Sequence, residues 1–136
     1  MPTRASSIRV ESLPLQTQGR VPKRIREDRG ELVVLHPVGP VYNPVYFDIH
    51  PGGHHSRGGH YHKSKTEFCY VIEGSCILQY VDLDTGEQGS VAAHHGDLIT
   101  VSPRCAHRMY AVEFSRCLEF SADDVDYGED TVSYAF

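Results

Sequence analysis

The sequence predicts an all-β protein, folded as an antiparallel β-sandwich or β-barrel. Short runs rich in β-branched and aromatic residues recur along the chain, and turn signals with glycine or proline separate them. The chain has 136 residues, of which 40% are hydrophobic and 23% charged, which suits one globular domain. No amphipathic pattern longer than two helical turns competes with the predicted strands.

The predicted strands begin at residue 31. The run ELVVLH ends before a proline, and VYFDIH alternates apolar and polar residues until the segment PGGHHSRGG interrupts it. Two longer runs meet at Gly74, and the turn signals DTG and HHGD follow at 84–86 and 94–97. The predicted strands are residues 31–36, 45–50, 67–74, 75–83, 98–102, 107–114 and 117–122, and the acidic segment 122–130 has room for one helical turn.

The first part of the chain reads differently from the rest. Residues 1–20 are polar and irregular, so we predict an N-terminal arm or tail there, and a single domain over residues 21–136. Exposed strands of a small barrel favour association, so a homodimer is expected.

Composition excludes several classes of function. A net charge of −5 and a pI of about 5.9 argue against nucleic-acid binding. No apolar run approaches the roughly 18 residues of a membrane helix, and the N-terminus has no signal-peptide pattern, which favours a cytoplasmic protein. The four cysteines have no CxxC spacing and are expected to be reduced and buried.

His60 and His62 form an HxH pair within the stretch RGGHYHK. Because side chains alternate along a strand, both imidazoles project to the same side and can reach one ion. Glu67 follows after a short corner and shares a face with Cys69 and Val71, which we expect to line the barrel. A carboxylate buried there must be paired, protonated or bound to a metal, so we predict a metal site.

The spacing of these residues resembles the first motif of the cupins. That motif reads glycine, HxH, three or four residues, Glu, six residues and glycine, and His60, His62, Glu67 and Gly74 match it. The resemblance implies that the domain is a cupin-type antiparallel β-barrel, or jelly roll.

The second cupin motif is matched in part. Gly96 is followed by His107 at the expected eleven-residue step, but Pro103 is displaced by one residue, and Ala111 stands where asparagine is usual. The resemblance implies that His107 is the fourth metal ligand. Three imidazoles and one carboxylate suit one divalent transition metal, which we leave open among Zn, Fe, Mn, Ni and Cu.

Three segments also resemble the WxcM-like sugar-nucleotide 3,4-ketoisomerases: residues 27–35, 57–63 and 117–130. Members of that family act on thymidine-diphosphate-linked 4-keto-6-deoxy sugars. Their two motif histidines are thought to move protons without a required metal. The resemblance implies that Arg29 and Arg57 bind substrate, near the nucleotide diphosphate and the sugar.

The sequence departs from that family in ways that bear on chemistry. Glu67 replaces the usual glutamine, and no tryptophan is present. Glu67 and His107 together restore the metal-binding pattern. In this the chain is similar to the metal-holding cupin domain of capsular-sugar epimerases.

We therefore expect an isomerase or epimerase that removes a proton α to the carbonyl of a sugar nucleotide or similar small molecule, with the metal stabilising the enediolate. Tyr46, on a strand near the barrel, and His54, in the loop before the HxH pair, are candidate catalytic proton carriers. The alternatives are a non-haem metal dioxygenase, a small metal-dependent cyclase of polyketide type, and a non-enzymatic binding cupin.

Overall fold

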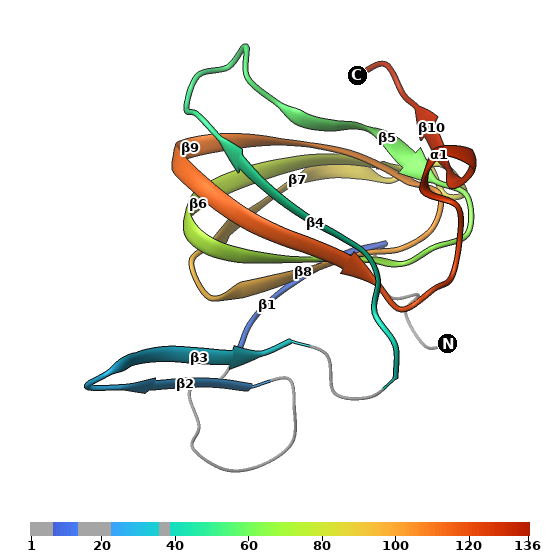
Figure 1. The fold of residues 1–136 in the computed structure, drawn as a ribbon. Coiled ribbons are helices and arrows are strands. Elements are labelled where there is room, and N and C mark those ends of the chain that lie inside the picture. The colour runs from blue at the N-terminus through green and yellow to red at the C-terminus, as the bar shows by residue number, and fades with distance from the viewer. Residues whose placement is uncertain (1–6, 14–22, 36–38) are drawn as a thin grey trace, which may run out of the picture.

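The computed structural model describes residues 7–13, 23–35 and 39–136, which form two sheets and one short helix. Figure 1 shows strands that curl around a common interior, with a separate hairpin beside them. The elements are β1 (Ile8–Ser12), β2 (Lys23–Glu27), β3 (Gly30–Val34), β4 (Tyr42–Ile49), β5 (Arg57–His62), β6 (Glu67–Asp82), β7 (Gln88–His94), β8 (Asp97–Val101), β9 (Cys105–Ser121), α1 (Tyr127–Asp130) and β10 (Thr131–Ser133).

The main sheet has eight strands, and all its named pairings are antiparallel. Its order is β1-β8-β6-β9-β5-β10, while β4 pairs with β9 and β7 pairs with β6. The predicted all-β, jelly-roll class is confirmed. The helical turn expected within residues 122–130 is α1.

Two long strands connect the halves of the barrel. The runs predicted as separate strands at 67–74 and 75–83 join in the single strand β6, and those at 107–114 and 117–122 join in β9, except that residues 83 and 122 lie just beyond the two strands. Each pair of predicted runs forms one strand because the chain bends at the junction instead of turning back. Gly74 has φ +94, and a Cβ added there would lie 2.4 Å from the carbonyl oxygen of Phe114. Glycine therefore permits the close approach of β9 where the β6–β9 register shifts.

Alternation along β6 and β9 fills the barrel with apolar side chains. Full burial of each aliphatic side chain contributes roughly 1.5–3 kcal/mol to folding. Cys69 and Val71 face inward on β6, as predicted, and Glu67 on the same face is also buried. The core cluster is made mainly of Ile49, Cys69, Val71, Cys76, Leu78, Ile99, Val101, Met109, Ala111 and Cys117.

The hairpin of β2 and β3 covers part of the outer face of β6. Tyr70 is buried there and its hydroxyl lies 3.2 Å from Glu31 of β3, while Phe68 packs in the same cluster. Ile72, the next residue on this face, is exposed. The predicted strand 31–36 overlaps β3, although its last residue lies outside the described part of the chain.

The N-terminal region contributes a strand to the barrel. β1 lies inside the predicted arm 1–20 and pairs with β8 from Ile8↔Val101 to Ser12↔Asp97. Residues 1–6 and 14–20 of that arm lie outside the described residues. All four cysteines are buried and unpaired. Within the described ranges, no helix is long and apolar enough to cross a membrane.

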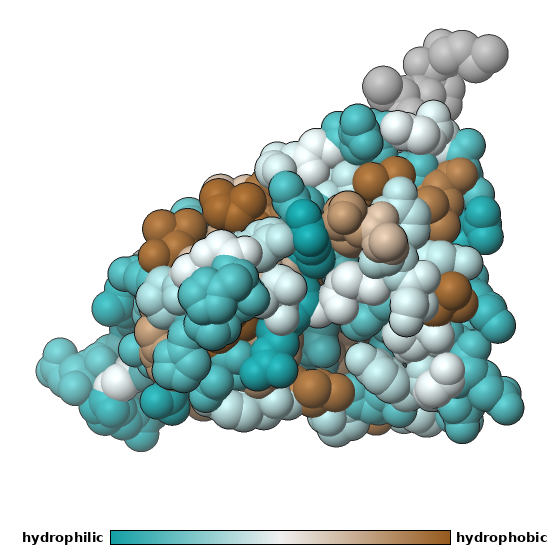
Figure 2. All heavy atoms as spheres, turned by 90° about the horizontal axis from the view of Figure 1, so that it is seen from above, coloured by the Kyte–Doolittle hydropathy of each residue, from teal (hydrophilic) through white to brown (hydrophobic). Residues whose placement is uncertain are grey.

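The molecular surface mixes polar and apolar residues. Figure 2 shows one face, on which hydrophobic residues lie in small groups among hydrophilic ones. Large hydrophobic side chains that are exposed include Leu32 on β3, Val112 on β9 and Phe136 at the C-terminus. Scattered exposure of this kind is usual for a folded protein. The homodimer expected from the exposed strands stays a prediction.

Candidate functional site

The four predicted ligands meet inside the barrel although three strands supply them. His60 and His62 project inward from β5, Glu67 opens β6, and His107 lies on β9. Pairing of β5 with β9 places His60 opposite His107. One ligand atom from each of the four residues lies within 4.8 Å of the others.

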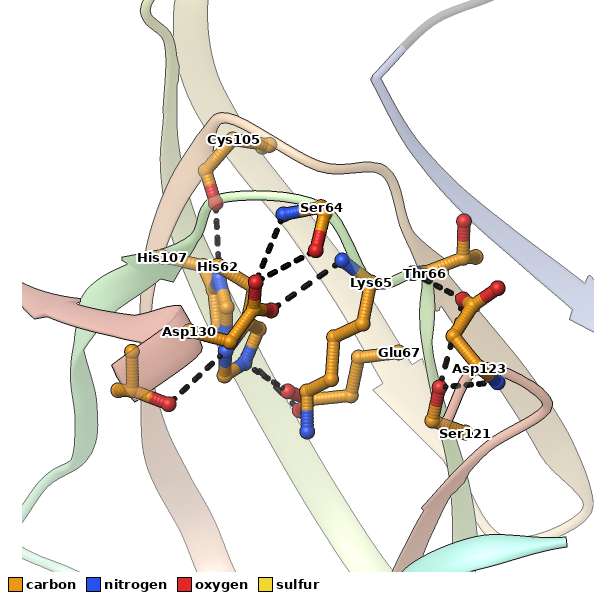
Figure 3. Close-up of polar contacts among 11 residues, drawn as sticks. His62, Ser64, Lys65, Thr66, Glu67, Cys105, His107, Ser121, Asp123 and Asp130 are labelled. Carbon is orange, nitrogen blue, oxygen red and sulfur yellow. Dashed lines mark hydrogen bonds and ion pairs between the residues drawn. The ribbon is translucent and has the colours of Figure 1, made fainter. Parts of the chain in front are cut away.

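Hydrogen bonds orient the two buried histidines toward Glu67 (Figure 3). Nδ1 of His107 donates to the carbonyl oxygen of Cys105 over 2.9 Å, so its Nε2 carries a lone pair. That Nε2 lies 3.8 Å from Oε1 of Glu67. Nε2 of His62 pairs with Oε2 of Glu67, and its Nδ1 lies 3.2 Å from the hydroxyl of Thr131.

The histidines of the site are neutral at physiological pH. Burial is the largest cause that lowers the pKa of His60, His62 and His107, and with the positive charge of Lys65 it brings the pKa to about 4 in each case. Neutral imidazole is the form that binds a metal.

The donor set fits a divalent transition metal. Nε2 of His107 and Oε1 of Glu67 both present lone pairs to the same buried space, an arrangement that a shared cation would satisfy. Three imidazole nitrogens and one carboxylate leave coordination positions for water or substrate. The cluster of His60, His62, Glu67 and His107 could therefore hold such an ion.

Glu119 is a functional candidate that sequence reasoning missed. It lies on β9 opposite Cys69 of β6. Its side chain lines a cavity that Glu67 and His107 also line. Burial, a hydrogen bond with Glu67 and the charge of Glu67 raise the pKa of Glu119 to about 9, so it is protonated at neutral pH. One signal was present in the sequence: Glu119 is two residues from Cys117 in a predicted strand, on the same side as a residue expected to be buried.

A cavity of about 200 Å³ opens beside the cluster. Its walls are mostly apolar, and its polar lining comes from three ligands of the cluster together with Glu119, Arg57 and Tyr127. The guanidinium of Arg57 donates from Nε and Nη2 to the carbonyl oxygen of Asp48, at 3.1 and 3.0 Å, which fixes its position. The apolar lining residues are Val45, Phe47, Cys69, Leu78, Ile99, Val101 and Met109.

The C-terminal segment closes one side of the site. Tyr127 of α1 lines the cavity, and burial raises the pKa of its phenol. The carboxylate of Asp130 accepts hydrogen bonds from Ser64 and from the backbone N–H of Lys65, and so attaches α1 to the loop between β5 and β6. This attachment also places Thr131 beside His62.

Three other predicted site residues are not brought to the cavity. Tyr46 is 54% exposed on β4, whereas its neighbours Val45 and Phe47 line the cavity. Its side chain therefore points to the opposite face of the strand. His54 is exposed in the loop before β5 and lines a separate hollow, which it shares with Arg57.

Arg29 lies in the turn between β2 and β3. Its side chain is 86% exposed and pairs with Glu27 at 2.9 Å. It does not line the cavity. Of the two predicted substrate-binding arginines, Arg57 alone lies at the site.

Solved structures of sugar-nucleotide enzymes share the fold of this barrel. The TDP-quinovose 3,4-ketoisomerase from Campylobacter jejuni superposes with a TM-score of 0.71 and 16% identity, over 95% of this chain and 94% of that one. The dTDP-4-dehydrorhamnose 3,5-epimerase from Sulfolobus tokodaii gives a TM-score of 0.73 and 16% identity, over 99% and 81%.

A third structure carries a sugar nucleotide. It is a point mutant of the 3,4-ketoisomerase from Thermoanaerobacterium thermosaccharolyticum in complex with TDP-4-keto-6-deoxyglucose, with a TM-score of 0.69 and 14% identity, over 94% and 88%. At these identities the structures show a shared fold.

No curated protein sequence matches the chain. Residues 45–117, more than half of its length, match the family model described as Cupin domain. This range contains His60, His62, Glu67 and His107. The predicted resemblance is confirmed, and the chain belongs to the cupin family.

Proposed function

We propose that this cupin is a metal-binding isomerase or epimerase that moves a proton α to the carbonyl of a keto-sugar nucleotide. One observation carries the proposal: three residues of the ligand cluster and the proton-bearing Glu119 line one small cavity. A Lewis-acid position beside a proton-transfer group is what α-proton chemistry needs.

The residues that would hold the metal are His60, His62, Glu67 and His107. When bound there, a divalent metal would supply Lewis-acid stabilisation of the negative charge that develops on the substrate carbonyl. Apolar walls such as Leu78 and Ile99 exclude water from the reacting carbon, which strengthens electrostatic interactions inside the cavity.

Glu119 is the group that moves the proton. Its carboxyl takes a proton from the α-carbon in the ionised form and returns it at the neighbouring carbon or to the opposite face. A high pKa gives the ionised carboxylate the proton affinity that a carbon acid requires. The positive charge of Lys65 favours this ionised form. Tyr127, which lines the same cavity, is a second hydroxyl able to donate to the substrate.

Cavity size and charge support a substrate made of a sugar ring and an anionic group. A volume of about 200 Å³ is smaller than the roughly 300–1,000 Å³ of sites that enclose drug-sized ligands. It suits a single sugar ring. Arg57 lines both this cavity and the neighbouring hollow, so it can bind the anionic part that extends outward. The sugar nucleotide bound to the Thermoanaerobacterium protein supports this substrate class.

Deuterium exchange tests the proposal directly. The purified chain, with its metal content measured by elemental analysis, is incubated in D₂O with TDP-4-keto-6-deoxyglucose, and ring deuteration is followed by NMR. We expect exchange next to the carbonyl, and a loss of about 100-fold or more in Glu119→Gln. Glu113→Gln, an exposed change on the same strand, is the matched control and should exchange normally. Metal-dependent oxygen uptake without exchange would instead identify a dioxygenase.

A further inference from the structure

Lys65 is a buried charged residue next to the ligand cluster. It lies in the loop between β5 and β6, two residues before Glu67, and only 2% of its surface is exposed. An ammonium group taken out of water is costly to place unless its surroundings compensate the charge. Its position therefore calls for a physical explanation.

Two contacts hold Lys65 in place. Its backbone N–H donates to Oδ2 of Asp130 over 3.2 Å, and the adjacent Ser64 donates to Oδ1 of Asp130 from both its N–H, at 3.0 Å, and its hydroxyl, at 2.6 Å. Nζ of Lys65 lies 4.5 Å from the centre of the Tyr127 ring, a cation–π distance. Two residues of α1 thus contact Lys65, one at its backbone and one at its ammonium group.

The ammonium group is directed into the site. In Figure 3 the Lys65 side chain extends toward the carboxylate of Glu67. After burial, the charge of Lys65 is the largest electrostatic cause of the lowered pKa of His62, and it acts in the same direction on His60 and His107. All three histidines therefore experience this positive charge.

We propose that Lys65 is a fixed positive charge of the metal centre, which weakens divalent-cation binding and keeps the loaded cavity positive toward an anionic substrate. This inference rests on the proposed function, since it assumes that His60, His62, Glu67 and His107 bind a metal.

The charges of the site explain the effect. Glu67 is the one carboxylate among the four proposed ligands, and the other three are imidazoles, which carry no negative charge. The positive charge of Lys65 opposes the negative charge of the Glu67 carboxylate, so an arriving divalent cation is attracted less strongly. Once loaded, the centre retains the full charge of the ion. That charge favours a sugar nucleotide and the negative oxygen that forms during proton transfer.

Zinc titration of charge-removal variants tests the inference. Zn²⁺ affinity is measured by calorimetry against a competing chelator. The pH is kept near 8, where exposed carboxylates are ionised. The variant is Lys65→Met, which keeps an unbranched side chain of similar length and removes the charge. The matched control is Lys63→Met, the same change at an exposed position of the same loop.

We expect Lys65→Met to bind Zn²⁺ at least about tenfold more tightly than the wild type, because a like charge is removed from the ion's surroundings. Lys63→Met should stay within about twofold of the wild type, since its charge is screened by solvent. The gain in Lys65→Met should persist between about 0.05 M and about 0.5 M NaCl, because salt screens a buried charge weakly.

The outcomes separate the two proposals. Unchanged or weaker Zn²⁺ binding in Lys65→Met, beside a wild type that binds, overturns the role of Lys65 and leaves the metal centre standing. Failure of both proteins to bind overturns the metal centre and this inference with it. Thermal melting verifies the fold of each variant, and Lys65→Gln provides the same readout where Lys65→Met does not fold.

Discussion

The hydroxyl oxygen of Thr131 lies 3.2 Å from Nδ1 of His62, on the ring nitrogen opposite the one that pairs with Glu67. A hydroxyl can both donate and accept, so it satisfies Nδ1 in either tautomer of the ring. The imidazole therefore stays oriented in the tautomer that carries its proton on Nδ1, which is the form whose Nε2 lone pair would bind a cation. β10 thus supports the candidate site although it supplies no ligand.

Removing this hydroxyl should weaken metal binding. Thr131→Val keeps the shape and leaves Nδ1 of His62 without its partner, and we expect a Zn²⁺ affinity about 10–100-fold lower. Competition with a chromophoric chelator measures the change. Thr131→Ser, which retains the hydroxyl, should bind like the wild type. Equal affinities for the valine and serine variants would show that the hydroxyl plays no part.

The three buried histidines should make the metal-free protein sensitive to acid. Their pKa is about 4 in the folded state and near 6.5 when unfolded, so the unfolded chain binds more protons between those values. The free energy of unfolding should therefore rise with pH across that window and fall as the pH drops from about 6.5 toward 4.

Urea denaturation after chelator treatment, at several pH values, measures this slope. Replacing His60, His62 and His107 together by asparagine should flatten the slope in this window. A triple variant as steep as the wild type would assign the acid sensitivity to other groups.

Glu119 should have the opposite effect at alkaline pH. Its pKa is about 9 in the folded protein against an ordinary value of 4.5, so the folded state holds the proton more tightly than the unfolded chain. The stability that the neutral form contributes is fully present below about pH 4.5 and is lost as the pH rises through 9. Glu119→Gln cannot ionise, so its free energy of unfolding should decline less from pH 6 to 9 than that of the metal-free wild type.

Denaturation at both ends of this range measures the difference. Glu113→Gln, at an exposed position of β9, should decline as the wild type does. A parallel decline in Glu119→Gln would mean that Glu119 titrates normally.

The bend of β6 should depend on Gly74. Alanine there must adopt φ +94 and place its Cβ 2.3 Å from Oγ of Ser115, so we expect a loss of about 2 kcal/mol or more in the free energy of unfolding. Gly86→Ala is the control for backbone strain alone, because φ is +77 but nothing lies within 4 Å of the added Cβ. It should lose about 1 kcal/mol. Equal losses, measured by urea denaturation, would exclude close packing as the cause.

Local pattern was sufficient to predict much of this molecule. Side chains alternate between the two faces of any extended strand. This alternation was enough to predict that His60 and His62 share one face, and that Glu67 shares a face with Cys69. The spacing of the two motifs was enough to predict the barrel and its family. It also led to the prediction of His107 as the fourth ligand. The structure brings these four side chains together.

Tertiary structure decided the rest of the site. Alternation does not tell which face of a strand turns inward: in the fold Val45 lines the cavity, whereas Tyr46 is exposed on the opposite face. Burial and the neighbouring Glu67 carboxyl raise the pKa of Glu119, and Glu67 comes near it because β9 pairs with β6.

The sequence by itself therefore determined the strand periodicity, the cupin motifs and the ligand types, because these depend on neighbouring residues. Only the folded barrel decided which further groups surround the ligands, namely Glu119, Lys65, Tyr127 and Thr131. Their proximity arises from contacts between distant segments, and burial then raises the pKa of Glu119 and Tyr127.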